Sequence, residues 1–197
     1  MYSQNDEEKW IMDFYGSFVG KFLDIGAHNG IELSNTRRLV ELGWNGVCIE
    51  PSPTVFAQLL RLYERTPTVA AVNCAIDIES KVKLFLDNDG GYVSTLLREH
   101  QIKMSTQHGS CYRGMYLKTA TINDILDTFG VNFNFINIDI EGMDYEILKT
   151  IPIGSMKSLH MICMEQCNTQ QVLLDYVSQY GFTKLIETRE NLIVVRK

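Results

Sequence analysis

Long apolar runs are missing from this sequence. The longest ones, such as Val69–Val72 and Met161–Met164, are far shorter than the ~20 residues that a membrane-spanning helix needs. The opening residues, Met1–Trp10 (MYSQNDEEKW), are polar and acidic, whereas a signal peptide has a basic start followed by an apolar stretch. We therefore expect a soluble, cytoplasmic protein with no membrane partner.

A basic excess is also missing. The 18 Lys and Arg residues are outnumbered by 24 Asp and Glu residues, which gives a formal net charge of -6. Proteins that bind nucleic acids or anionic membranes neutralise phosphates with a surplus of Lys and Arg. The composition therefore argues against both as partners, and it leaves room for a small ligand held in a local site.

Cysteine is scarce, and its five positions contain no C-x-x-C pair. Cys163 and Cys167 are the only near neighbours, and no histidines accompany them at the spacing of a zinc site. The histidines themselves are scattered, at His28, His100, His108 and His160. We predict reduced, mostly buried thiols in a reducing compartment, and no metal site made of cysteine or histidine.

What is present is an alternation of short β-rich apolar runs with longer segments of helical period. With 197 residues, the chain has the length of a single domain, 1–197. Strands are expected at 21–25, 46–50, 69–73, 81–86, 134–138 and 159–164, helices at 34–42, 54–65, 121–129, 144–149 and 169–179, and a hairpin at 182–187 and 191–195. This order predicts an α/β fold, a three-layer αβα sandwich around a mostly parallel sheet with an antiparallel carboxyl-terminal hairpin. Residues 88–113 follow no period and are predicted to form a substrate lid, or a partly ordered loop.

The first predicted strand ends in a D-x-G-x-x-x-G turn, in which Gly26 and Gly30 would let the backbone approach a ligand. In open α/β sheets, ligands bind beyond the carboxyl ends of the strands. The spacing differs from the G-x-G-x-x-G of dinucleotide sites, and Asp24 would repel a pyrophosphate but could pair with an ammonium group. The turn therefore favours a ligand with an amino-acid part.

Glu50 follows the second predicted strand, 24 residues beyond Gly26. A carboxylate at this point can accept hydrogen bonds from both ribose hydroxyls, although an acid before a helix is also favoured by the helix dipole. After the third strand, Cys74, Ala75 and Ile76 provide an apolar slot suited to an adenine ring. Together these positions predict an adenosine-type ligand without a 2′-phosphate.

Three acids follow the later strands, Asp139 and Glu141 in a D-I-E-G sequence and Glu165 one strand further on. They should converge at one edge of the sheet, where burial and mutual repulsion would raise the pKa of one of them into the range of a general base. The same acids with Asn168 are the hard oxygen ligands that magnesium uses, so a metal-assisted site is the less favoured alternative. His100 and His108 are alternative bases delivered by the lid.

Three segments, FLDIGAHNGIELSNT, GVCIEPSP and INIDIEGMDYEIL, together with the leading SQNDEE, resemble the FkbM-type methyltransferases. These are a branch of the class I S-adenosylmethionine-dependent enzymes, and the resemblance covers Ser3 to Glu165. It implies a seven-stranded Rossmann-like sheet, S-adenosylmethionine as cofactor, S-adenosylhomocysteine as product, and methyl transfer to a hydroxyl oxygen. Asp139 and Glu141 would face the reaction centre as the catalytic pair. The cofactor-binding residues that it implies are Asp24, Gly26, Ala27, His28, Gly30, Glu50, Pro51, Cys74, Ala75, Ile76 and Ser94.

We therefore predict an O-methyltransferase that acts on a sugar, a glycan or another small hydroxylated metabolite, with a carboxylate base. The alternatives are a metal-assisted O-methyltransferase and a catalytically inactive cofactor-binding module; a nucleotide-dependent oxidoreductase is disfavoured by the glycine spacing. Methyltransferases of nucleic-acid bases typically carry N-P-P-Y or D-P-P-Y where this chain has D-I-E-G, and Glu165 stands where RNA ribose methyltransferases have lysine. Side chains near the loop that could stack on a sugar or steer an anionic group are Tyr92, Tyr112, Tyr116, Arg113 and Lys118.

Overall fold

The computed structural model describes residues 1–89, 91–166 and 170–196. Gly90, Cys167, Asn168 and Thr169, which the sequence predictions included, lie outside the described residues. The main sheet contains β1 (Lys21–Ile25), β2 (Asn45–Ile49), β3 (Val69–Val72), β7 (Phe135–Ile138), β8 (Met161–Glu165), β9 (Thr183–Glu187) and β10 (Asn191–Val195). Its helices are α1 (Glu7–Tyr15), α2 (Arg37–Glu41), α3 (Pro53–Tyr63), α5 (Ile122–Phe129), α6 (Asp144–Thr150) and α7 (Gln170–Ser178).

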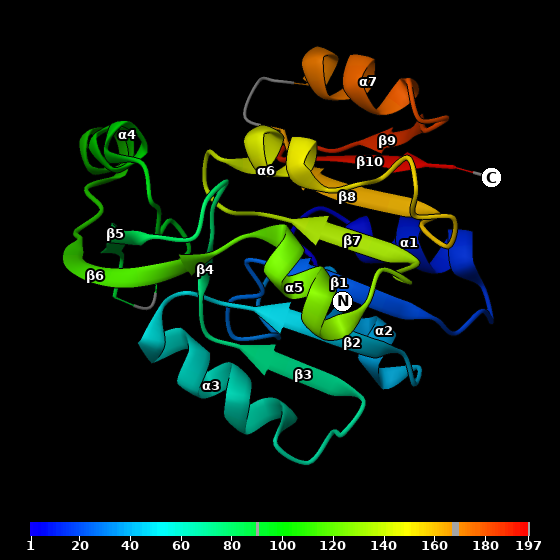
Figure 1. Cartoon of the computed structure of the whole chain (residues 1–197), viewed down its shortest axis with the longest axis horizontal. Coiled ribbons are helices and arrows are strands. Elements are labelled where there is room, and N and C mark those ends of the chain that lie inside the picture. Colours follow the sequence, from blue (N-terminus) through cyan, green and yellow to red (C-terminus); the bar gives the residue numbers. More distant parts are fainter. Residues whose placement is uncertain (90, 167–169, 197) are drawn as a thin grey trace.

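The seven strands are arranged in the order β3-β2-β1-β7-β8-β10-β9 (Figure 1). Strands β3, β2, β1, β7 and β8 pair in parallel, whereas β10 is antiparallel to both β8 and β9. This confirms the predicted mostly parallel sheet with an antiparallel carboxyl-terminal hairpin. Because the chain builds outward from β1 to β3 and then returns to β7, the switch point that favours ligand binding lies between β1 and β7.

Alternate residues of the strands enter two separate cores, as buried strands in a three-layer fold require. Phe22 packs on one face of the sheet with residues of the first three helices, Ile11, Leu39 and Leu59. Leu23 packs on the opposite face with residues of the later helices, Ile125, Ile147 and Leu173. Each fully buried side chain of this size contributes about 1.5–3 kcal/mol. The predicted αβα sandwich is confirmed.

A second, three-stranded sheet stands beside the main one, in the order β4-β6-β5 (left in Figure 1). Its strands are β4 (Ala75–Ile76), β5 (Val82–Asp87) and β6 (Arg113–Ala120), and between the last two lies α4 (Arg98–His108). The sequence analysis predicted no helix within 88–113. The prediction missed α4 because the sequence REHQIKMSTQH is polar on nearly every side and buries only His100, which leaves no apolar period to detect.

Helix α1 was also not predicted, although its buried residues Glu7, Ile11 and Tyr15 have helical spacing. Helix α2 is shorter than the predicted 34–42. Its predicted first turn is instead a polar turn in which the Arg37 amide donates to Ser34 Oγ at 3.0 Å. Helix α5 begins with a capping box, in which Thr121 and Asp124 each accept from the other's backbone N–H. In the part of the chain that the structure describes, every helix is too short or too polar to cross a membrane.

Candidate functional site

A cavity of about 530 Å³ lies at the carboxyl edge of the main sheet. This volume is typical of pockets that hold a cofactor or another small ligand. The residues predicted to be catalytic or to bind the cofactor all line it, except Gly30; they are Asp24, Gly26, Ala27, His28, Glu50, Pro51, Cys74, Ala75, Ile76, Ser94, Asp139 and Glu141. Their individual roles remain predictions, but their convergence follows from strands that end at the same edge.

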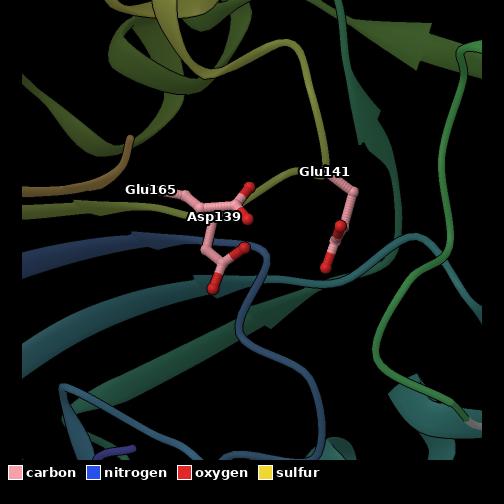
Figure 2. A group of neighbouring side chains, drawn as sticks. All are labelled: Asp139, Glu141 and Glu165. Carbon is pink, nitrogen blue, oxygen red and sulfur yellow. The ribbon is translucent and has the colours of Figure 1, made fainter. Parts of the chain in front are cut away.

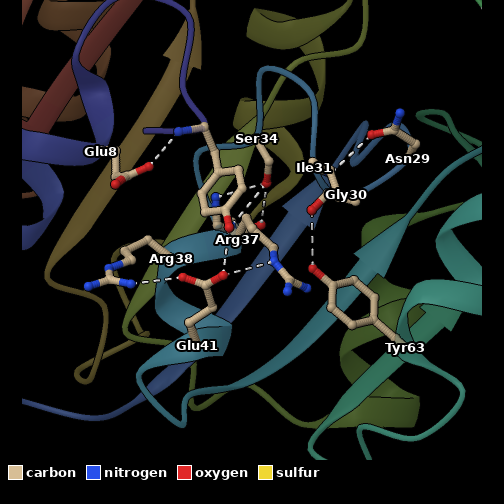
Figure 3. A network of polar contacts seen from close by, with 11 residues as sticks. Glu8, Asn29, Gly30, Ile31, Ser34, Arg37, Arg38, Glu41 and Tyr63 are labelled. Atoms are coloured by element: carbon tan, nitrogen blue, oxygen red, sulfur yellow. Dashed lines mark hydrogen bonds and ion pairs between the residues drawn. The ribbon is translucent and has the colours of Figure 1, made fainter.

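The two glycines of the turn after β1 serve different purposes. Gly26 has a φ of +89°, and a Cβ built there would lie 1.8 Å from the carbonyl oxygen of Asp139. Gly26 therefore lets the ends of β1 and β7 approach each other. Gly30 faces α3 instead of the cavity: an added Cβ would lie 2.8 Å from Leu59 Cδ1, and the Tyr63 hydroxyl donates to the Gly30 carbonyl at 3.4 Å (Figure 3). The expectation that Gly30 admits a ligand is not matched by its position.

We expect Gly26→Ala to destabilise the protein by more than about 4 kcal/mol or to prevent folding, because the new methyl group meets the backbone of β7. Gly43→Ala is the matched control, since Gly43 has a φ of +88° with no atom within 4 Å of an added Cβ. That variant should lose only about 1–2 kcal/mol from backbone strain. Urea unfolding of both variants checks this prediction, and equal losses would contradict it.

Asp24 is held in place by a chain of buried polar side chains. It is only 2% exposed, and its carboxylate accepts from Thr36 Oγ1 at 2.6 Å and from Asn137 Nδ2 at 2.9 Å. Asn35 in turn donates to Asn137 Oδ1 at 3.0 Å. Burial raises the pKa of Asp24, while the bonds from Thr36 and Asn137 oppose that rise. The sequence analysis missed Asn137, although an amide inside the apolar strand FINI signals a buried polar partner.

Glu50 presents a constrained carboxylate to the cavity. Its two oxygens accept from the backbone amides of His28, at 3.0 Å, and Ser52, at 2.8 Å. Burial raises the pKa of Glu50 to about 7, against the effect of these two bonds, and the nearby Asp87 and Asp24 add to the rise. Glu50 therefore changes charge near neutral pH and, when ionised, is a strong hydrogen-bond acceptor.

Asp139, Glu141 and Glu165 meet where β7 and β8 end (Figure 2). Each offers a carboxylate oxygen, and these oxygens all lie within 4.8 Å of one another. Burial raises the pKa of Asp139 well above its ordinary range, and the neighbouring Glu165 and Glu141 raise it further. Crowded carboxylates of this kind accept protons more readily than isolated ones and also favour a bound cation.

The segment before α4 contributes further residues to the cavity. The Ser94 hydroxyl accepts from the Asn88 amide at 2.9 Å and donates to Asp87 at 3.2 Å, so its partners are the end of β5 and the loop that follows. The Tyr92 ring lies 4.6 Å from the His28 ring, between centroids. Among the aromatic and basic residues singled out near the loop, Tyr92 lines the cavity, whereas the others, Tyr112, Arg113, Tyr116 and Lys118, are not part of its lining.

Comparison with protein families decides which kind of site this is. The family described as the methyltransferase FkbM domain matches residues 24–183, most of the chain. The chain belongs to the FkbM methyltransferase family. This confirms the resemblance seen in the sequence, to a family of S-adenosylmethionine-dependent methyltransferases. No curated protein sequence gives a significant match.

Solved structures support the fold of this FkbM-family methyltransferase. A methyltransferase FkbM from Methylobacillus flagellatus KT has a TM-score of 0.62 and 16% identity, covering 98% of this chain and 48% of that one. The chain therefore spans about half the length of that structure. The METTL16 methyltransferase domain has a TM-score of 0.53 and 13% identity, covering 96% and 65%. A human methyltransferase 10 domain containing protein has a TM-score of 0.51 and 12% identity, covering 98% and 80%.

The cavity of the FkbM-family methyltransferase has groups that fit S-adenosylmethionine. Glu50 offers the two carboxylate oxygens that a ribose diol needs, held by backbone amides. Cys74 and Ile76 provide apolar surface for an adenine ring, and the turn after β1 lies toward the acids at the ends of β7 and β8. A negatively charged wall suits a sulfonium cation.

Proposed function

We propose that this FkbM-family methyltransferase methylates a hydroxyl oxygen of a neutral sugar, glycan or other small hydroxylated metabolite, with a carboxylate as general base. The observation that carries the proposal is that the predicted cofactor-binding residues other than Gly30 line a single cavity together with the three acids. When bound, S-adenosylmethionine supplies an electrophilic methyl group. The protein then has to align the acceptor oxygen and remove its proton.

Glu141 is our assignment for the group that takes the proton of the acceptor hydroxyl. Asp139 lies beside the turn after β1, since its amide donates to the Ile25 carbonyl at 2.9 Å and its own carbonyl faces Gly26. Glu141 lies two residues further along, against α4, and it lines the same cavity. Asp139 and Glu165 lie beside Glu141, and the carboxylate oxygens of the three residues are all within 4.8 Å of one another.

The charge of the cavity favours an acceptor that carries no negative charge. Among the described residues that line it, Arg189 is the only Lys or Arg. The acids in the lining are Asp24, Glu32, Glu50, Asp139, Glu141, Glu165 and Glu190. A phosphate or carboxylate on the acceptor would be repelled by these groups. Steering of an anionic group by Arg113 and Lys118 is not supported, because neither lines the cavity.

The experiment that tests this proposal is incubation with S-adenosylmethionine and a panel of acceptors, followed by mass spectrometry of the products. The panel contains methyl glycosides of neutral sugars, the matching uronic acids, and amines that lack hydroxyl groups. We expect methylated neutral glycosides and little or no methylated uronic acid. Transfer to the amines alone would overturn O-methylation. Binding of S-adenosylhomocysteine without any transfer would favour the inactive binding module.

We expect exhaustive treatment with EDTA to leave the rate of methyl transfer unchanged. In the proposed reaction, a carboxylate takes the proton directly, so no metal-bound oxygen is needed. Asp139, Glu141 and Glu165 are nevertheless ligand types that magnesium accepts, which makes the measurement informative. A loss of activity that magnesium restores would favour the metal-assisted alternative.

A further inference from the structure

Helix α4 contacts the candidate base, Glu141, through the side chain of His100. His100 Nε2 lies 2.9 Å from Glu141 Oε2, and the His100 residue is only 8% exposed. The two residues come from different parts of the fold, because Glu141 follows β7 of the main sheet whereas His100 belongs to the helix between β5 and β6. The two side chains are within ion-pair distance, and their contact lacks the alignment of a regular hydrogen bond.

Helix α4 has no apolar face to hold it against the rest of the protein. A surface helix is normally anchored by an apolar stripe, but the one buried residue of α4 is His100. The packing is nevertheless close, because a Cβ at Gly142 would lie 3.3 Å from both His100 Nδ1 and Leu97 Cδ1. Helix α4 is polar, and its buried contact with the sheet is a histidine against a carboxylate. Such a contact is typical of a functional site and not of a hydrophobic core.

The backbone around Glu141 is fixed independently of His100. Glu141 has a φ of +57°, which is uncommon for a residue with a side chain, and such strained positions persist only when their surroundings hold them. The Thr95 hydroxyl donates to the Glu141 carbonyl at 3.0 Å. Asp144 begins α6 directly after this turn, and its carboxylate accepts from the amides of Ile140, at 3.1 Å, and Gly142, at 3.2 Å. The turn is therefore held at several points, and His100 lies against the carboxylate end of the Glu141 side chain.

We propose that His100 is the positioning residue for Glu141, and that α4 is a lid whose closure orients the base. This inference rests on the proposed function. His100 Nε2 faces Glu141 Oε2, which leaves Oε1 to accept the proton of the acceptor hydroxyl. If α4 moves away from the sheet, the contact between His100 and Glu141 is lost. Closure of α4 over the substrate therefore also orients the Glu141 carboxylate.

The test compares His100→Leu, which keeps bulk but removes the donor, with His100→Gln, which keeps an N–H donor. We expect His100→Leu to speed amide hydrogen exchange in residues 98–108 and to lower kcat by up to about 100-fold on the best acceptor of the panel. Affinity for S-adenosylhomocysteine should stay unchanged. His100→Gln should recover most of the exchange protection and most of kcat. Gln107→Leu, at an exposed position of the same helix, is the matched control and should behave as wild type.

Three outcomes would overturn the inference: wild-type kcat in His100→Leu, no recovery in His100→Gln, or a loss of S-adenosylhomocysteine affinity that accounts for the lost rate. Failure of the proposed function gives a different result, namely no transfer from the wild-type protein to any hydroxyl in the panel. In that case the exchange measurements still decide the matter. Unchanged protection of 98–108 in His100→Leu would show that His100 does not hold the helix and would overturn the inference.

Discussion

Replacing Glu141 with glutamine should lower the rate of methyl transfer by about 10²- to 10⁴-fold, the usual contribution of general base catalysis. Glutamine has nearly the shape of glutamate, and its carbonyl oxygen can occupy the place of the carboxylate oxygen that lies 2.9 Å from His100 Nε2. It cannot take up the proton of the acceptor. Steady-state rates on the best acceptor of the panel, together with calorimetry of S-adenosylhomocysteine binding, measure the two effects separately.

The matched control is Glu146→Gln, which makes the same chemical change at an exposed position of α6 and should leave the rate unchanged. Cofactor affinity should be nearly the same in Glu141→Gln and wild type. Normal turnover in Glu141→Gln would contradict the assignment. If Asp139→Asn then abolished turnover, the role of base would pass to Asp139, whose burial and acidic neighbours raise its pKa.

Replacing Glu50 with glutamine should weaken cofactor binding by about 100-fold at pH 8 and, without cofactor, should flatten the dependence of stability on pH. Loss of one charge-assisted hydrogen bond costs about 1.5–3 kcal/mol, which explains the weaker binding. The pH effect follows from the folded-state pKa, which burial raises from 4.5 to about 7. Because this pKa is raised, Glu50 supports the folded state below pH 4.5, and that support is lost as pH rises through about 7.

The free energy of unfolding should fall by about 3 kcal/mol as Glu50 ionises with rising pH. Urea unfolding of wild type and Glu50→Gln at pH 5 and pH 8 measures it, and the difference between the two pH dependences isolates Glu50 from the other acids. Glu64→Gln, an exposed glutamate at the end of α3, should keep the wild-type dependence. An identical pH dependence in wild type and Glu50→Gln would contradict a raised pKa at this residue.

The larger architecture could be predicted because its signals are local. The runs KFLDI, GVCIE and FINI are apolar, rich in β-branched residues and separated by helical periods, and each forms a strand of the main sheet close to its predicted bounds. The polar helix α4 was missed, because its position depends on a contact with a distant turn and not on a periodic apolar face. Helix α1 was missed although its acidic first turn and the spacing of Ile11 and Tyr15 both favour a helix.

The sequence by itself determined the sheet, the family, and the acids that follow the strands, because parallel strands bring their carboxyl ends to one edge wherever they occur. Only the tertiary structure decided what surrounds each acid. Asp24 meets Asn137 and Glu141 meets His100, pairs that no local period connects. Burial by distant segments raises the pKa of Glu50 to about 7. Such contacts depend on the path of the whole chain, whereas the pattern along one segment records only which of its faces is apolar.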